Sequence, residues 1–405
     1  MNHTHHPALL AALIPLSLAA AAFLLGIKGA SGADQTVMPT VDQLPSIPQL
    51  PDPFLFPDGS RVKTAADWRR RREQIKQLVL YYEYGHPAPD PKNVKGEVVS
   101  SAPDPSGGTA KQVHLTMGPD DKVAFDIELT IPTGKGPFPV IIKGDGCWGR
   151  VKPEIIADIV KRGYVLAEFD RTHVAPDDKS RDKGVLAAYP EADGGDEAAW
   201  AWGFSRVIDY LLTQDFIDKD KVIVTGHSRG GKAALLAGAL DERVALTVPN
   251  GSGAGGAGCY RVQPPKTEDL ERIVTHFPNW FGPHFAQFIG HVDQLPFDQH
   301  EVRALVAPRG LLSTDGFADI WANGPGTQAS YLAAKEVYTF LGVPEKIGIH
   351  FRQGKHDQLE EDFVALLDFA DHLLLGKPAA QDFTRLPFPD EPKAHPWTAP
   401  VAEGK

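Results

Sequence analysis

The chain has 405 residues, of which 42% are hydrophobic and 23% charged, the balance of a globular protein that can bury a sizeable core. The formal net charge of −11 repels polyanions on average, so the composition argues against nucleic-acid binding. Its 35 prolines and 39 glycines indicate long ordered loops between the secondary-structure elements, as in a large enzyme.

The first 33 residues have the pattern of a secretory leader. Residues 8–27 are apolar and carry no charge, and small residues suited to cleavage follow at positions 30–33. The sequence therefore predicts a signal peptide over residues 1–33 and a secreted or periplasmic protein. Because the apolar run is as long as a membrane span of about 20 residues, an uncleaved anchor is the alternative, and only then is membrane contact expected.

The rest of the chain divides into three parts by its proline content. We expect a proline-rich, extended segment over residues 34–64 and one catalytic domain over residues 65–376. A second proline-rich segment, over residues 377–405, is expected to form a C-terminal tail.

The catalytic domain begins with a helix, predicted over residues 65–84. Four consecutive arginines, Arg69 to Arg72, lie within it, and we interpret them as a solvated face with surface ion pairs rather than an anion site. Two β-type runs follow over residues 111–117 and 123–132, and the alternation in the second suits an antiparallel pair.

From residue 138 onward, apolar strands alternate with helices. The expected strands cover residues 138–144, 164–170, 221–226, 244–249, 309–316 and 346–354, and the expected helices cover 153–163, 196–214, 232–240, 328–341 and 360–375. Near-continuous apolar strands separated by helices predict an α/β protein with a mostly parallel central sheet covered on both faces.

Residues Gly226 to Gly230 fit the pattern G-x-S-x-G, with Ser228 at the centre. In this motif the serine occupies a strained strand-to-helix turn, and small flanking residues let the backbone fold tightly around it. The next backbone N–H, at the positive end of the helix, then faces the developing oxyanion. An apolar strand before the motif and an alanine-rich helix after it favour a nucleophile over a simple helix cap.

A serine nucleophile needs an acid and a base, which follow it in that chain order in α/β-hydrolases. His356 comes just after the last predicted strand, where the base belongs. Asp319, in the loop after the strand over residues 309–316, is expected to orient the imidazole. Asp315 is closer to that strand and competes for the role, with a turn residue as its simpler interpretation. The pattern predicts an α/β-hydrolase fold.

The two cysteines, Cys147 and Cys259, are too few for a disulfide framework. They could pair in an exported protein, and the sequence leaves that bond open. Serine chemistry of this kind needs neither a metal nor an organic cofactor, so none is expected.

Several longer stretches make the chain resemble one known family. "GHSRGGK" (226–232) resembles the G-C-S-R-x-G-K signature of the glucuronoyl esterases, carbohydrate esterase family 15. From Trp68 to about Leu375 the resemblance continues in "YYEYGHP" (81–87), "DRTHVAPD" (170–177), "AWAWGFSRVIDYL" (199–211), "SGAGGAGCYR" (252–261), "FPNWF" (277–281), "LPFDQHEVRALVAPRGLL" (295–312) and "DIWAN" (319–323). The resemblance implies cleavage of esters between 4-O-methyl-glucuronic acid on xylan and lignin alcohols.

The resemblance also implies roles for side chains near Ser228. The Arg229 guanidinium would help to stabilise the oxyanion, where the alternative is a surface ion pair. Lys232, one helical turn beyond the serine, would contact sugar hydroxyls, although the residues alone suggest a solvated lysine. Trp321 would line the sugar site, although a tryptophan considered alone could equally belong to the hydrophobic core. Glu268 matches a sugar-binding Glu or Gln more loosely.

The chain departs from the family pattern in three places. Gly251 stands where many members have the catalytic Glu, so the acid must come from Asp319, as in some bacterial members, and we expect a bacterial-type protein. His227 replaces a cysteine, and residues 355–357 lack the cysteine that would bridge to it, so we expect a looser site without that disulfide. Cys259 lacks the partner that fungal members provide.

The sequence therefore favours a serine esterase acting on glucuronoxylan and lignin–carbohydrate esters. An acetyl xylan esterase or a broad carboxylesterase is the alternative on the same scaffold, although Lys232 and Trp321 favour a sugar acid. The alternative from another class is a non-catalytic carbohydrate-binding protein with a decayed site, for which Gly251 is the only support.

Overall fold

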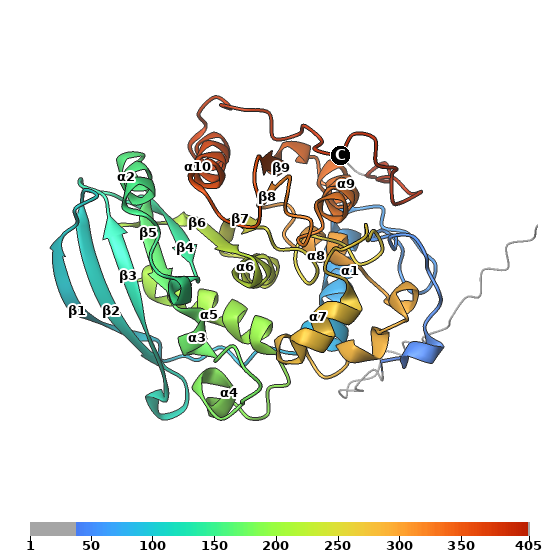
Figure 1. Cartoon of the computed structure of the whole chain (residues 1–405), viewed down its shortest axis with the longest axis horizontal. Helices are drawn as coiled ribbons and strands as arrows, with labels where there is room; N and C mark the ends of the chain where they lie inside the picture. Colours follow the sequence, from blue (N-terminus) through green and yellow to red (C-terminus); the bar gives the residue numbers. More distant parts are fainter. Residues whose placement is uncertain (1–37, 404–405) are drawn as a thin grey trace, which may run out of the picture.

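A computed structural model describes residues 38–403, and the predicted signal peptide lies outside the described residues. Its centre is a nine-stranded sheet in the order β1-β2-β3-β5-β4-β6-β7-β8-β9 (Figure 1). The six strands from β5 to β9 in this order run parallel, and β1, β2 and β3 extend the sheet in antiparallel fashion. The strands are β1 (Lys95–Pro103), β2 (Thr109–Met117), β3 (Val123–Ile131), β4 (Phe138–Lys143), β5 (Val165–Phe169), β6 (Ile217–His227), β7 (Val244–Asn250), β8 (Gly310–Gly316) and β9 (Ile347–Arg352).

Helices cover both faces of the sheet, as predicted (Figure 1). The described helices are α1 (Ala65–Val79), α2 (Pro153–Lys161), α3 (Arg171–Val174), α4 (Gly184–Ala188), α5 (Asp196–Leu211), α6 (Arg229–Leu240), α7 (Leu270–His276), α8 (Gln299–Ala304), α9 (Gly324–Phe340) and α10 (Glu360–Leu375). Successive residues of one strand enter different cores: Ile141 packs with α2 and α10, whereas Val140 and Ile142 pack in the larger core with α5 and α6. This two-sided burial explains the near-continuous apolar strands.

The predicted strands and helices from residue 138 onward are confirmed, with boundaries shifted by a few residues. The predicted antiparallel pair is confirmed as β2 and β3, and the helix predicted over 65–84 is α1 followed by a π-helical turn, Leu80–Tyr84. The edge strand β1 was missed because every residue in it is exposed, so no apolar alternation marks it.

The prediction of a solvated arginine face on α1 is wrong for half of the run. Arg71 and Arg72 are buried, whereas Arg69 and Arg70 are exposed. Arg72 donates from Nε to the carbonyl of Leu305 (2.9 Å) and from Nη2 to that of Ala239 (3.0 Å). Both carbonyls lie at helix C-termini, where a cation satisfies groups that have no partner within the helix.

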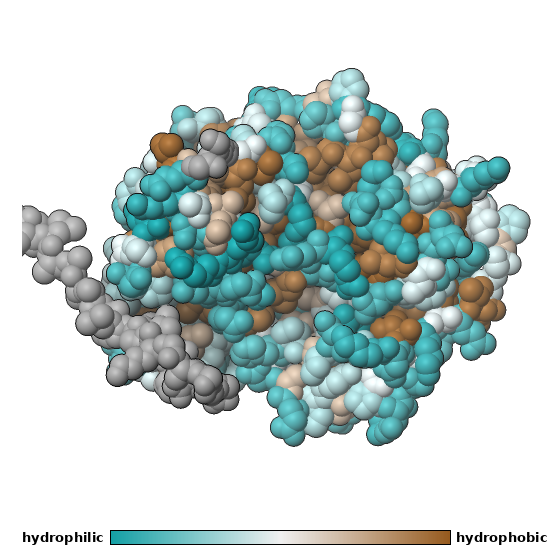
Figure 2. Space-filling model, turned by 180° about the vertical axis from the view of Figure 1, so that it is seen from behind, coloured by the Kyte–Doolittle hydropathy of each residue, from teal (hydrophilic) through white to brown (hydrophobic). Residues whose placement is uncertain are grey.

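Three further features concern the cysteines, possible metal sites and possible membrane spans. Cys147 and Cys259 are both free, so the bond left open by the sequence is not formed. Among residues 38–403, no three or more His, Cys, Asp or Glu side chains are grouped so that they could hold a metal ion. No helix in this range is long and apolar enough to cross a membrane. On the face shown in Figure 2, hydrophobic areas are interrupted by hydrophilic residues.

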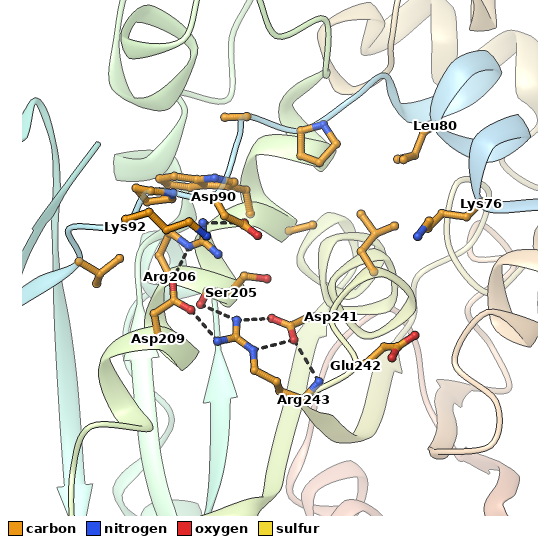
Figure 3. Close-up of a pocket in the computed structure, with 17 residues that line it drawn as sticks. Lys76, Leu80, Asp90, Lys92, Ser205, Arg206, Asp209, Asp241, Glu242 and Arg243 are labelled. Atoms are coloured by element: carbon orange, nitrogen blue, oxygen red, sulfur yellow. Dashed lines mark hydrogen bonds and ion pairs between the residues drawn. The ribbon is translucent and has the colours of Figure 1, made fainter. Parts of the chain in front are cut away.

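A cavity of about 680 Å³ lies next to the loop between α6 and β7, at the amino-terminal edge of the parallel strands (Figure 3). Five of its charged residues pair with one another: Arg243 contacts Asp209 and Asp241 at 2.6 Å each, and Arg206 contacts Asp90 at 2.8 Å. None of the predicted catalytic residues lines it. The cavity is therefore separate from the carboxyl-terminal edge, where the serine lies.

Replacement of Arg72 tests its structural role. Arg72→Ala leaves the carbonyls of Ala239 and Leu305 without their donor, and we expect it to lower the free energy of unfolding by about 1–3 kcal/mol, measured by urea denaturation. The matched control is Arg69→Ala on the exposed side of α1, which should change it by less than about 0.5 kcal/mol. Equal effects of the two substitutions would contradict the anchoring role.

Candidate active site

Ser228 occupies the turn between β6 and α6, with φ 54° and ψ −122°. Residues with a side chain rarely adopt this positive φ. The tight turn also leaves no space for a side chain at the flanking glycines. A Cβ on Gly226 would collide with the carbonyl of Gly230, and a Cβ on Gly230 would collide with the carboxylate of Asp145. The G-x-S-x-G spacing thus has a steric cause here, and the predicted strained turn is confirmed.

The structure brings Ser228, His356 and Asp319 together at the carboxyl ends of β6, β8 and β9. The Ser228 Oγ lies 2.9 Å from His356 Nε2, and His356 Nδ1 lies 2.6 Å from Asp319 Oδ2. An ionised carboxylate only accepts, so Nδ1 carries the proton and Nε2 is free to accept from the serine hydroxyl. The Asp319 side chain is 3% exposed and that of His356 35%, so the carboxylate is shielded and the base is accessible.

Asp315, the competing acid, lies elsewhere. It is buried in β8, and neither carboxylate oxygen has a hydrogen-bond partner among the described residues. Burial, and then the neighbouring Asp319 and Asp362, raise the pKa of Asp315 well above its ordinary value. Burial in β8 thus disfavours the charged form of Asp315, and the contact with His356 belongs to Asp319.

Asp145 joins the loop after β4 to the serine turn. Its carboxylate accepts from the backbone N–H of His227 (2.8 Å) and from Arg171 Nη1 (2.7 Å), and Lys143 also pairs with it. Burial alone would raise the pKa of Asp145, but the two cations outweigh it and leave that pKa below its ordinary value. A fixed anion thus supports the backbone immediately before Ser228.

Arg229 is held in a well-defined orientation beside the serine. Its Nη1 donates to Asp177 Oδ2 (2.6 Å), and Asp177 Oδ1 accepts from Trp280 Nε1 (2.8 Å). The guanidinium lies 4.6 Å from the Trp280 ring centroid and 5.2 Å from that of Phe277, which stacks on Trp280 at 3.9 Å. The ion pair weighed as an alternative is present, and Nε still has no partner among the described residues.

Lys232 and Glu268 form a buried pair rather than an open sugar site. The Lys232 side chain is 3% exposed, and its ammonium donates to Glu268 Oε2 (2.9 Å), to the Ser252 carbonyl (2.6 Å) and to the Ala254 carbonyl. An ammonium has three protons, and all three have acceptors here. The Glu268 backbone N–H donates to the carbonyl of Trp321 (3.0 Å), so the pair also supports the loop that carries this tryptophan.

Trp321 is among the exposed apolar residues around the triad. It is 42% exposed and follows Asp319 by two residues, and Ile320 between them is 58% exposed. Trp148, in the loop after β4, is 52% exposed and lies 5.9 Å from the His227 ring. A polar triad with exposed aromatic side chains on separate loops is suited to a substrate with both polar and apolar parts.

Four of these residues have contacts that sequence reasoning did not assign: Asp145, Asp177, Trp280 and His227. Asp145 could have been found, because it follows the end of β4 at the edge where Ser228 also lies. Asp177 and Trp280 lie in two stretches, 170–177 and 277–281, that resemble the family, but nothing in their spacing indicates that their side chains are in contact.

Comparison with known proteins identifies the family. Residues 116–342 match a family model described as "Glucuronyl esterase, fungi". A 4-O-methyl-glucuronoyl methylesterase of Schizophyllum commune is 35% identical over 348 residues, which cover 82% of this chain and 84% of that protein. The chain belongs to the glucuronoyl esterase family. Its members are carboxylic ester hydrolases, as the sequence predicted.

Solved structures agree with this assignment. A carbohydrate esterase family 15 glucuronoyl esterase from Caldicellulosiruptor kristjansonii superimposes with a TM-score of 0.76 at 35% identity, covering 89% of this chain and 99% of that one. A serine-to-alanine variant from Sporotrichum thermophile, in complex with methyl 4-O-methyl-β-D-glucopyranuronate, gives 0.70 at 27% identity, covering 83% and 90%. The predicted α/β-hydrolase fold is confirmed. Since both fungal and bacterial proteins are similar, the bacterial type stays a prediction.

Replacement of the two aspartates distinguishes their roles. Asp319→Asn removes the acceptor that fixes the His356 tautomer, and we expect kcat for ester hydrolysis to fall by about 10⁴-fold. Asp315→Asn changes a carboxyl that makes no hydrogen bond to His356 into an amide of the same shape, and should leave kcat close to that of the wild type. Steady-state kinetics on a glucuronate methyl ester measure both. A large loss in Asp315→Asn with little loss in Asp319→Asn would reverse the assignment.

Proposed function

We propose that this protein hydrolyses the ester between 4-O-methyl-glucuronic acid of glucuronoxylan and alcohols of lignin, outside the cytoplasm. The observation that carries the proposal is the Ser228–His356–Asp319 contact chain at the turn of a glucuronoyl esterase. The same contact argues against a decayed site, because Asp319 supplies the carboxylate that Gly251 cannot.

The geometry suits two-step acyl transfer. Ser228 Oγ attacks the C6 carbonyl carbon of the uronate, and its proton passes to His356 Nε2. Asp319 stabilises the resulting imidazolium through Nδ1–H. The tetrahedral intermediate expels the alcohol, which takes the proton from His356, and leaves an acyl-enzyme. Water then attacks the acyl carbon with His356 as its base, and the uronic acid and free Ser228 are released.

The oxyanion of the intermediate is stabilised at the start of α6. The Arg229 backbone N–H lies at the positive end of this helix, and the guanidinium adds a fixed positive charge next to it. Because Asp177 accepts from Nη1 and also from Trp280 Nε1, the role of Asp177 and Trp280 is to hold the guanidinium in place.

The sugar is expected to lie on the Trp321 side of the serine. Trp321 offers an exposed aromatic face, and the buried Lys232–Glu268 pair supports its loop. In this role the Lys232–Glu268 pair keeps the loop below the sugar rigid. A direct contact of the Lys232 ammonium with a sugar hydroxyl requires one of its three present acceptors to be exchanged.

The first experiment is an assay of the purified full chain on methyl 4-O-methyl-glucuronate and on p-nitrophenyl acetate. We expect a higher kcat/KM on the uronate ester, activity that survives a chelator, and loss of about 10⁶-fold in Ser228→Ala. A preference for the acetate would favour an acetyl or broad carboxylesterase. Tight glucuronoxylan binding without turnover would favour the non-catalytic alternative.

The role of Arg229 is tested by Arg229→Lys. Lysine keeps the charge but cannot hold Asp177 and present a second fixed donor, so we expect kcat to fall by about 10- to 100-fold with a smaller change in KM. Kinetics on the uronate methyl ester measure the two constants. A raised KM with unchanged kcat would instead show that Arg229 binds the ground state and transition state equally.

A further inference from the structure

His227, the residue directly before the nucleophile, packs against the catalytic imidazole. The centroids of the His227 and His356 rings are 4.5 Å apart, with an angle of 47° between the ring planes. On another side, the His227 ring meets Trp148 edge-on, with centroids 5.9 Å apart. The side chain therefore forms a wall beside the base of the triad, a role that the mechanism above does not use.

The hydrogen bonds of Asn250 fix the form of this ring. Asn250 is fully buried, and its Nδ2 donates to the carbonyl (3.2 Å) and to Oγ1 (2.9 Å) of Thr314. Its Oδ1 therefore faces His227 Nδ1, at 2.6 Å. An amide oxygen only accepts, so His227 Nδ1 carries a proton and the ring is the neutral Nδ1–H tautomer. Burial, and then the neighbouring His356, lower the pKa of His227 to about 4.

The backbone of Gly251 packs closely against the His227 ring. A Cβ at this position would lie 3.3 Å from His227 Cε1, 3.4 Å from Nδ1 and 3.5 Å from Asp319 Oδ2. The imidazole thus lies between Gly251 and the catalytic histidine, close to the acid of the triad. Asn250, Gly251 and Trp148 contact it from separate sides, so its position is closely defined.

We propose that His227 is a positioning residue: its ring holds the His356 imidazole over Ser228 and shields the His356–Asp319 hydrogen bond from water. The inference rests on the proposed Ser228–His356 pair. A shift of about 1 Å in a catalytic group can lower a rate by about 100-fold, so a wall at this contact affects the chemical step.

The His227 ring has to be uncharged if it is to position His356 without opposing the charge that His356 acquires. During each acyl transfer His356 becomes an imidazolium, and a second positive ring 4.5 Å away would oppose that charge. The charged and titratable groups that face His227 are Lys143 and Asp145 from the β4 side and His356 from the β9 loop, with the Asp319 carboxylate across Gly251. Asn250 supplies a neutral acceptor, which fixes the ring without adding a charge.

The experiment compares His227→Ala, which removes the wall, with His227→Phe, which keeps a ring without the hydrogen bond to Asn250. His114→Ala is the matched control, because His114 is also a half-buried histidine paired with an acceptor (Asp126, 2.7 Å) but lies on β2 near the far edge of the sheet. Two rates are measured: hydrolysis of the uronate methyl ester, and phosphonylation of Ser228 by an aryl fluorophosphonate. The second forms a bond from Ser228 Oγ to phosphorus with release of fluoride, and needs no sugar recognition.

For His227→Ala we expect kcat and the phosphonylation rate to fall together by about 10- to 100-fold with KM nearly unchanged, and His227→Phe to recover most of the loss. The control should match the wild type. A His227→Ala phosphonylation rate equal to that of the wild type would overturn the inference, as would a His227→Phe rate as low as that of His227→Ala. If the wild type is phosphonylated rapidly but does not hydrolyse the uronate ester, the proposed function fails and the inference on His227 stands.

A measurement on the unmodified protein covers the case in which a variant does not fold. Nitrogen-15 histidine NMR distinguishes the Nδ1–H tautomer from the other neutral form and from the charged ring. We expect His227 to show the Nδ1–H form throughout pH 5–8. A charged His227 ring, or the opposite tautomer, at neutral pH would overturn the inference.

Discussion

The active site depends on one backbone constraint, the positive φ of Ser228. Holding an ordinary residue in such a conformation costs about 1–3 kcal/mol, so the surrounding structure must stabilise it. Here β6 and α6 are packed in the core on both sides of the turn, and Gly226 and Gly230 remove the side chains that would block it. Asp145 occupies the space beside Gly230 and binds the backbone N–H of His227. The loop after β4 is thereby joined to the nucleophile, so the turn and its neighbouring loop form one unit.

The cations around this turn are paired with carboxylates, and Asp145 serves both Arg171 and Lys143. Arg171 pairs with Asp145 at 2.7 Å, Arg229 with Asp177 at 2.6 Å, and Lys232 with Glu268 at 2.9 Å. Unpaired buried charges are strongly destabilising, so the pairing allows three cations near one serine. Glu197 lies nearby with no partner among the described residues, and burial raises its pKa well above the ordinary value. Asp177 thus holds the Arg229 guanidinium beside Ser228, where the proposed mechanism develops an oxyanion.

Features that depend on residues close together in the chain could be predicted from the local sequence pattern. The apolar strands, the glycines around Ser228 and the loop positions of His356 and Asp319 could all be predicted, because each follows from periodicity or from place relative to a strand end. Features that depend on distant partners could not. By local sequence Arg71 and Arg72 resemble solvated charges, but α8 and the chain at the ends of α8 and α6 supply their acceptors. Lys232 likewise resembles a solvated lysine, but the loop after β7 buries it. The choice between Asp319 and Asp315 needed geometry, since both are close to the end of β8.

Two of the three departures from the family pattern, considered separately in the sequence, form a single arrangement in the structure. Gly251 has no side chain, His227 stands in place of a cysteine, and the disulfide to the histidine loop is missing. The His227 ring fills the space that a side chain at position 251 would need, and its contact with His356 lies where the covalent link is absent. The looser site expected without that disulfide stays a prediction, and in the structure packing and the Asn250 hydrogen bond restrain the ring. The acid that contacts His356 comes from the β8 loop, where Asp319 lies. Glycine suits position 251 for two reasons: its φ of 52° is rarely adopted by residues with a side chain, and a Cβ would lie 3.3 Å from the His227 ring and 3.5 Å from Asp319 Oδ2.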